Sequence, residues 1–117
     1  MTSTPTYARY TSNAIFKEFQ AQGLRVDAVQ EMSKDSFGAD APRYSEAKGF
    51  LCGTNGAATA TLFTFDSATD LAAMSEYIRK KYGSKQRQLT HDNVLLVFWL
   101  PSKDDTFGYD SALLALR

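Results

Sequence analysis

The residues of this chain best suited to nucleophilic chemistry are its single cysteine and its single histidine, Cys52 and His91. The attacking species is the thiolate, so a reactive cysteine needs an electropositive, partly exposed setting or a histidine within reach. Nothing in the spacing of the two residues brings them together. We therefore interpret Cys52 as a small apolar residue on a strand, facing a core of phenylalanines.

Gly49, Gly53 and Gly56 have a spacing that invites comparison with phosphate-binding loops. Those loops connect a strand to a helix whose N-terminus meets the anion, whereas here a second strand is predicted to follow. The lysine and the following Ser or Thr of a Walker-type loop are also missing. The pair Asn55-Gly56 instead predicts a β-hairpin, because both central residues of a type I′ turn need positive φ.

The hairpin prediction fixes which residues face each other. A turn centred on Asn55-Gly56 pairs Cys52 with Thr59. On this register Phe50 and Cys52 share a face with two aromatic residues of the second strand, Phe63 and Phe65.

Metal-binding and acid–base chemistry find little support in the sequence. His91 and Asp92 are neighbours at the entrance to a strand, where successive side chains point to opposite faces. Asp104, Asp105 and Asp110 lack the alternating ligand spacing of an EF-hand loop, so capping and solubilising roles are favoured. We predict no catalytic residue, no metal site and no cofactor.

Two segments are predicted to offer binding surfaces. The first is the basic stretch at the end of a helix, where cations complement the helix dipole and where interleaved aromatic residues can contact an anion; its predicted binding residues are Arg79, Lys80, Lys81, Tyr82, Lys85 and Arg87. The second is the long polar connection at 33–46, because loops of this length often carry binding residues. Its aromatic candidates are Phe37 and Tyr44.

Composition limits the class of protein. The 117 residues fit one domain large enough to bury a core. Thirteen basic and thirteen acidic residues give zero net charge, so a nucleic-acid partner that depends on bulk positive potential is not favoured. A protein partner or self-association is expected instead.

The cellular compartment stays open. One cysteine cannot form an internal disulfide, no apolar run is long enough to span a membrane, and no signal peptide is visible. Residues 1–9 are rich in Ser, Thr and Pro and are predicted to form a flexible arm before a single domain at 10–117. The chain is expected to be soluble and cytoplasmic as it stands, or extracytoplasmic if a leader has been removed.

Helix and strand signals alternate along the domain. A helix is predicted from the N-cap Thr11 to Gly23, and a second from the capping box at Ser67 to Gly83. Strands are predicted at 24–32, 47–53 and 57–65, and a continuous apolar strand runs from Asn93 to Pro101. A last helix follows, with apolar residues at helical spacing.

This order, αβββαβα, predicts an α+β domain. The strand, helix, strand run at 57–100 suggests one crossover and therefore one parallel pair beside the antiparallel hairpin. We expect a two-layer fold: a four-stranded, mostly antiparallel mixed sheet with helices mainly on one face.

The order of features also resembles an uncharacterised group of small bacterial α+β domains that are often lipoprotein-like or secreted. The similarity lies in "IFKEFQAQGLRV", "TLFTFDSATDLAAMSEYI" and "DNVLLVFWL" followed by "YDSALLAL". The resemblance implies a non-enzymatic domain outside the cytoplasm and brings no catalytic residues.

The leading functional hypothesis is a small non-catalytic binding or accessory domain that acts through a protein or ligand surface, because the polar residues that catalysis demands do not cluster in the sequence. Two alternatives stay open. One is a hydrolase-type enzyme using His91 with a serine or Cys52. The other is anion or nucleic-acid binding through residues 79–87.

Overall fold

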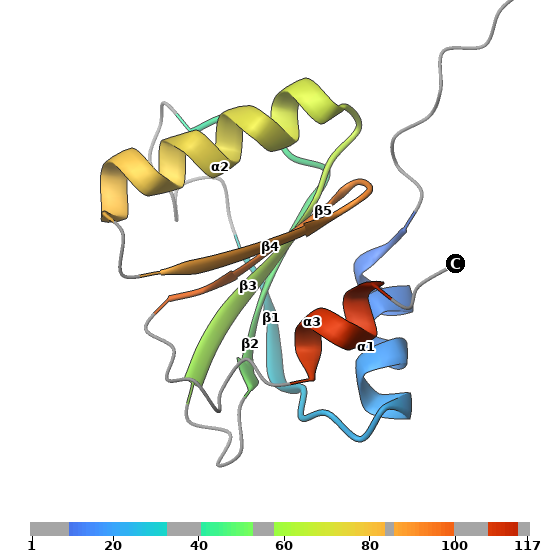
Figure 1. Cartoon of the computed structure of the whole chain (residues 1–117). Helices are drawn as coiled ribbons and strands as arrows, with labels where there is room; N and C mark the ends of the chain where they lie inside the picture. The colour runs from blue at the N-terminus through green and yellow to red at the C-terminus, as the bar shows by residue number, and fades with distance from the viewer. Residues whose placement is uncertain (1–9, 33–40, 53–57, 84–85, 100–107, 115–117) are drawn as a thin grey trace, which may run out of the picture.

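Five strands form one antiparallel sheet, in the spatial order β1-β2-β3-β5-β4 (Figure 1). The structure is a computed structural model, and it describes residues 10–32, 41–52, 58–83, 86–99 and 108–114. The elements in chain order are α1 (Ser12–Ala21), β1 (Asp27–Glu31), β2 (Glu46–Cys52), β3 (Ala58–Thr64), α2 (Ala68–Tyr82), β4 (Arg87–His91), β5 (Val94–Phe98) and α3 (Tyr109–Leu114). The α+β class is confirmed; the flexible arm predicted at 1–9 lies outside the described residues.

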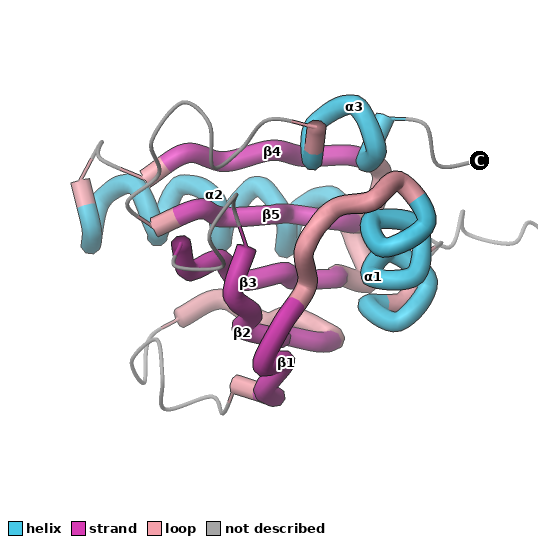
Figure 2. The backbone as a smooth tube through the Cα atoms, turned by 90° about the horizontal axis from the view of Figure 1, so that it is seen from below, coloured by secondary structure: helices cyan, strands magenta, loops and turns pink. Residues whose placement is uncertain are grey.

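Helices cover both faces of the sheet, so the predicted two-layer arrangement with helices mainly on one face is wrong. Helices α1 and α3 lie on one face and α2 lies on the other (Figures 1 and 2). Each face has its own set of buried side chains, because successive strand residues alternate between faces. The α1/α3 core includes Phe19, Leu62 and Leu96, and the α2 core includes Phe63 and Leu95.

The sheet has one strand more than the sequence pattern predicts. β4 precedes the apolar strand β5 and forms a hairpin with it, joined by Asp92 and Asn93. The φ of Asp92 is 49°, the left-handed value that the first central residue of a primed two-residue turn requires. This hairpin reverses the chain, so β3 and β5 are antiparallel, and the predicted parallel pair in a mixed sheet is wrong.

The register between β2 and β3 differs by one residue from the prediction. Cys52 pairs with Ala58, not with Thr59, which leaves residues 53–57 as the connection; the Asn55-Gly56 turn itself lies outside the described residues. A shift of one residue moves every side chain to the other face. Phe50 and Cys52 therefore lie in the α1/α3 core, and the expectation that they share a face with Phe63 and Phe65 is wrong.

Local signals placed the helices correctly. The side chain of Thr11 accepts a hydrogen bond from the backbone N–H of Ala14 at 3.3 Å and caps α1. Ser67 caps α2 in the same way, from the N–H of Asp70 at 3.1 Å. α2 ends at Gly83, whose φ of 81° is a value that glycine tolerates without a Cβ clash.

Strand β1 is the least regular strand, and its five residues are all exposed. It lies within the strand predicted at 24–32, but the residues that contribute to the cores are Val26 and Met32 at its two ends. The register shifts between Asp27 and Gln30, and Ala28 has a φ of 52°. β1 is therefore an edge strand with a bulge.

Two polar contacts fix α1 and the chain before it to the sheet. The carboxylate of Glu46 on β2 accepts hydrogen bonds from the backbone N–H and the hydroxyl of Ser12 at 3.0 and 2.8 Å, and from the Thr64 hydroxyl at 3.0 Å. The side-chain amide of the buried Asn93 bonds to both backbone groups of Tyr10: its Oδ1 accepts from the N–H at 3.0 Å, and its Nδ2 donates to the carbonyl at 2.9 Å. The N-terminus of α1 thereby lies against the negatively charged carboxylate of Glu46, which favours the attachment of α1 to the sheet.

These contacts determine the charge of Glu46. Burial raises the pKa of its carboxyl group, but the hydrogen bonds from Ser12 and Thr64 and the nearby charge of Lys48 favour the ionised form. The net result is a pKa below the ordinary value. Glu46 therefore binds its three donors as a carboxylate at neutral pH.

Candidate functional site

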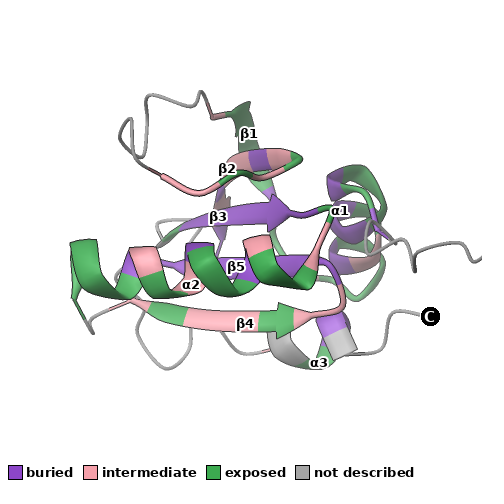
Figure 3. Ribbon diagram, turned by 90° about the horizontal axis from the view of Figure 1, so that it is seen from above, coloured by how far each residue is buried: buried purple, intermediate pink, exposed green. Residues whose placement is uncertain are grey.

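Within the described residues, α2 covers only part of the width of the sheet face on which it lies. Figure 3 shows α2 lying across β5, with β2 and β1 extending to one side. Beneath the helix Phe63 and Val97 are fully buried, whereas on the same face Leu51 is half-buried and Thr59 is exposed. The open part contains a hollow of about 380 Å³, lined by Ala28, Gln30, Met32, Gly49, Phe50, Leu51, Thr59, Ala60, Thr61 and Trp99.

One wall of the hollow is Trp99, the only tryptophan of the chain. Its indole Nε1–H donates a hydrogen bond to the Thr61 hydroxyl at 2.9 Å. The ring of Tyr82, at the end of α2, packs against it edge-on with 5.0 Å between ring centroids. Since a bond to β3 and a contact with α2 hold the indole, the wall is fixed before any ligand arrives.

The side of the hollow formed by β1 and β2 is shaped by a glycine and a methionine. A Cβ atom at Gly49 would lie 3.1 Å from Sδ of Met32, so the thioether of Met32 packs against the backbone of β2 where a side chain at position 49 would otherwise lie. The bulge of β1 adds Ala28 to the lining. Thioether and aromatic side chains are adaptable and polarisable contact groups and are enriched at interaction surfaces. The hollow can therefore receive an apolar or aromatic group.

Three of the predicted residues, Arg79, Lys81 and Tyr82, make contacts within the protein. Lys81 Nζ lies 3.1 Å from the Tyr77 hydroxyl and sits 5.4 and 5.7 Å from the ring centroids of Tyr77 and Tyr82. Arg79 forms an exposed ion pair with Glu76 at 3.6 Å. Through Tyr82, this helix end contacts the Trp99 wall of the hollow.

The other residues of the predicted basic stretch are exposed or lie outside the described residues. Lys80 is exposed on the last turn of α2, and Arg87 is exposed at the start of β4. Lys85 lies outside the described residues.

The predicted binding loop at 33–46 is only partly described. Tyr44 is half-buried and packs on Phe63 with 5.7 Å between ring centroids, as part of the α2 core. Phe37 lies outside the described residues. Tyr44 is a predicted binding residue, but in the structure it packs inward as part of the core.

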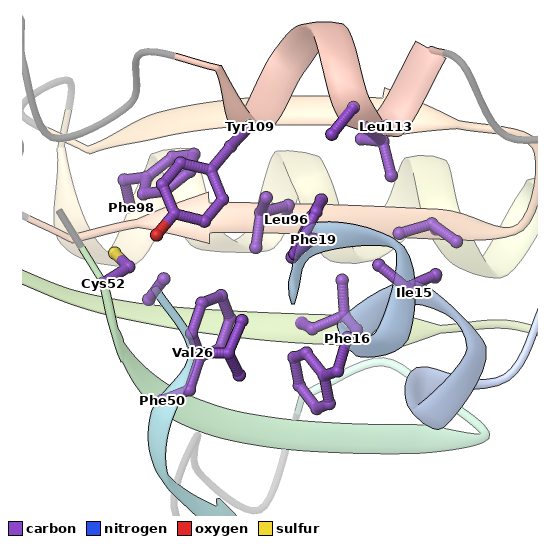
Figure 4. Close-up of a cluster of buried hydrophobic side chains, with 14 of the residues drawn as sticks. Ile15, Phe16, Phe19, Val26, Phe50, Cys52, Leu96, Phe98, Tyr109 and Leu113 are labelled. Carbon is purple, nitrogen blue, oxygen red and sulfur yellow. The ribbon is translucent and has the colours of Figure 1, made fainter. Parts of the chain in front are cut away.

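Cys52 and His91 are not brought together. Cys52 is fully buried near Phe50 and Phe98 (Figure 4). His91 pairs with Val94 at the opposite end of the sheet, about six strand positions, or roughly 20 Å, away along the strands. The hydrolase alternative therefore lacks a Cys52–His91 pair.

The surroundings of His91 are aromatic and acidic. Its ring stacks on Tyr10 with 5.8 Å between centroids, and its Nε2 lies 3.8 Å from a carboxylate oxygen of Asp92. Asp104 and Asp105 lie outside the described residues, as does the side chain of Asp110. In the described part of the chain, no three His, Cys, Asp or Glu side chains gather as a metal site would require.

Comparisons with protein-family models, with curated proteins and with solved structures find no significant match to this chain. The resemblance to small lipoprotein-like domains therefore stays an expectation. Within the described ranges, no helix has the length and apolar character needed to cross a membrane. The candidate site rests on geometry and chemistry alone.

Sequence reasoning missed the residues that form the hollow. In the sequence, Trp99 falls within a continuous apolar strand and Gly49 falls within a glycine-rich hairpin, and neither pattern predicts a site. The available signal was a tryptophan directly before a proline, at the point where the strand leaves the sheet. That signal indicates an aromatic residue at the rim of the sheet, but it gives no partner residues.

Proposed function

We propose that this protein is a small non-catalytic binding domain, and that the hollow beside Trp99 is the surface through which it contacts a ligand or protein partner. The observation that carries the proposal is a concave, mostly apolar stretch of sheet with an aromatic wall, left open by α2. Hollows of this size with a few polar groups among apolar ones are the usual form of binding sites.

The polar groups at the hollow suit recognition rather than catalysis. Gln30, Thr59 and Thr61 offer amide and hydroxyl groups but no titratable side chain. A general acid or base must lie within hydrogen-bond reach of the reacting group. Since the lining contains no Asp, Glu, His, Lys, Cys or Tyr, binding is the role that its chemistry supports.

Anion or nucleic-acid binding through residues 79–87 is the competing proposal. The contacts of Lys81 with two tyrosines and of Arg79 with Glu76 already occupy part of that charge within the molecule. The two proposals differ in their salt dependence. Binding to phosphates weakens steeply with salt, whereas insertion of an apolar group into the hollow does not.

The test uses Trp99 as its own reporter. A set of one- and two-ring aromatic fragments is titrated into the full chain while tryptophan emission is recorded. In the variant Gly49→Val, the new Cβ would lie 3.1 Å from Met32 Sδ, so the added side chain is expected to displace the flexible end of Met32 and to fill part of the hollow. The control Ala73→Val introduces the same residue type on the exposed side of α2.

We expect fragments that change Trp99 emission in the wild type and in Ala73→Val, with affinity at least about tenfold weaker in Gly49→Val, which corresponds to about 1.4 kcal/mol. Equal affinity in all three proteins, or fragments that leave Trp99 emission unchanged, would contradict the proposal.

A further inference from the structure

The outer edge of β4 is a second candidate interaction surface, because it is an edge of the sheet. Within the described residues, β4 pairs with β5 on one side and with no strand on the other. Its register with β5 runs without interruption from Arg87 to His91. An edge strand of this kind presents a row of backbone donors and acceptors to which another strand can add.

The turn determines which backbone groups face outward. In an antiparallel pair, residues alternate between exchanging both hydrogen bonds with the neighbouring strand and directing both groups away from it. A two-residue turn makes His91 and Val94 a bonded pair, and Leu89 and Leu96 follow in phase. The N–H and C=O groups of Gln88 and Thr90 therefore point away from β5.

Among the described residues, the edge at β1 has features that hinder strand addition, whereas the central residues of β4 have none; α3 contacts β4 from the α1/α3 face. β1 has a bulge, a residue with left-handed φ at Ala28, and the charged residues Asp27 and Glu31. Bulges and charges are the devices that prevent edge-to-edge pairing. In β4 the central residues, Gln88 to Thr90, are uncharged and regular.

The edge of β4 is also held in place on both faces. On one face, Gln88 Nε2 donates a hydrogen bond to the Ser75 carbonyl of α2 at 3.1 Å. On the other face, Leu89 packs against the α1/α3 core. An ordered strand loses little conformational entropy when another strand adds to it.

We infer that β4 pairs antiparallel with β4 of a second copy of this chain, about a two-fold axis at Leu89, so that one continuous sheet runs through both copies. This register sets Gln88 of each copy opposite Thr90 of the other, and these are the residues whose backbone groups point outward. Leu89 meets Leu89 at the axis, and Arg87 lies opposite His91.

Self-complementarity is the reason for choosing a second copy over a strand of another protein. The outward-pointing positions are symmetric about Leu89, so both outward residues of each copy meet a bonding partner. No carboxylate faces a carboxylate and no arginine faces an arginine on this register. Like charges directly opposite would have disfavoured the pairing.

The test compares the mass in solution and the amide exchange of the full chain. Thr90→Pro removes an N–H that does not bond to β5, so the fold can tolerate it at an edge, while the dimer loses a symmetric pair of hydrogen bonds. Thr90→Val at the same position keeps the N–H. Sedimentation equilibrium gives the mass against the 13.0 kDa of one chain, and hydrogen exchange followed by NMR reads the amides of Gln88 and Thr90.

The expected result is twice the chain mass for the wild type and Thr90→Val, and a single chain for Thr90→Pro. In the wild-type dimer, both amides should exchange at least about tenfold more slowly than in the diluted monomer. A monomer up to millimolar concentration, or a dimer in which the two amides exchange rapidly or which survives Thr90→Pro, overturns the inference. If Thr90→Pro does not fold, the wild-type mass and exchange decide.

Discussion

Replacement of Glu46 by glutamine tests how α1 is attached to the sheet. The carboxylate accepts three hydrogen bonds, from the backbone N–H and hydroxyl of Ser12 and from the hydroxyl of Thr64, at 2.8 to 3.0 Å. An amide retains one accepting oxygen and its NH2 group can only donate, so the bond from the Ser12 hydroxyl must break or reverse and the others become neutral. Hydrogen bonds to a charged group contribute about 1.5–3 kcal/mol and neutral ones about 0.5–1.5 kcal/mol.

From these values we expect Glu46→Gln to lower the free energy of unfolding by about 2 kcal/mol at pH 7. The folded state lowers the pKa of Glu46, so the stabilisation is fully present above the unfolded value, near 4.5, and is lost as the pH falls through the folded value. The difference between wild type and variant should therefore shrink as the pH falls below about 4.5 and vanish once Glu46 is protonated in the folded state.

Urea denaturation followed by circular dichroism, at pH 7 and again in acid, measures this difference. Glu31→Gln, on the exposed edge strand β1, is the matched control and should stay within about 0.5 kcal/mol of the wild type. A Glu46→Gln variant as stable as the control at pH 7, or one whose deficit is undiminished in acid, would refute the reasoning.

Three further predictions follow from single residues. Asn93→Ala removes both bonds to the Tyr10 backbone at a buried site and should destabilise the protein by about 2–4 kcal/mol in urea denaturation; a loss below about 0.5 kcal/mol would show that the contact is dispensable. Ala28→Gly relieves a φ of 52° and should raise stability by about 0.5–1 kcal/mol in thermal unfolding, whereas a loss would mean that the bulge needs a side chain there. The fully buried Cys52 thiol should react with a disulfide reagent only through opening of the fold, so rapid labelling of the native protein would contradict its placement.

Signals that act within one turn of chain were sufficient to predict the helices. Thr11 and Ser67 cap α1 and α2, and Gly83 ends α2, because side-chain hydrogen bonds and positive φ depend on neighbours in sequence. The hairpin register depends on the length of the connection as well as on the Asn-Gly pair. One residue in that length decided which core receives Phe50 and Cys52.

Strand β4 was missed for a physical reason. An edge strand is bonded on one side only, and β4 needs just one apolar residue, Leu89, to reach the α1/α3 core. Its polar neighbours read as a connection between helix and apolar strand. The missing strand then changed the predicted direction of β5 and, with it, the layer arrangement.

The candidate site depends on tertiary placement that no local pattern contains. Trp99, Gly49 and Met32 come from three separate segments, and in the part of the chain that the structure describes the hollow lies where α2 covers β5 but does not extend over β1 and β2. The sequence could predict the amphipathic helix. It could not predict how much of the sheet that helix covers.

The central claim is that the open sheet beside Trp99 binds an apolar group. NMR shift mapping of the isotope-labelled full chain with a bound aromatic fragment tests it most directly. The account predicts that the largest shifts fall on the Trp99 indole N–H and on the amides of Gly49, Leu51 and Thr61. Largest shifts at residues 79–87, with an unmoved indole signal, would contradict it.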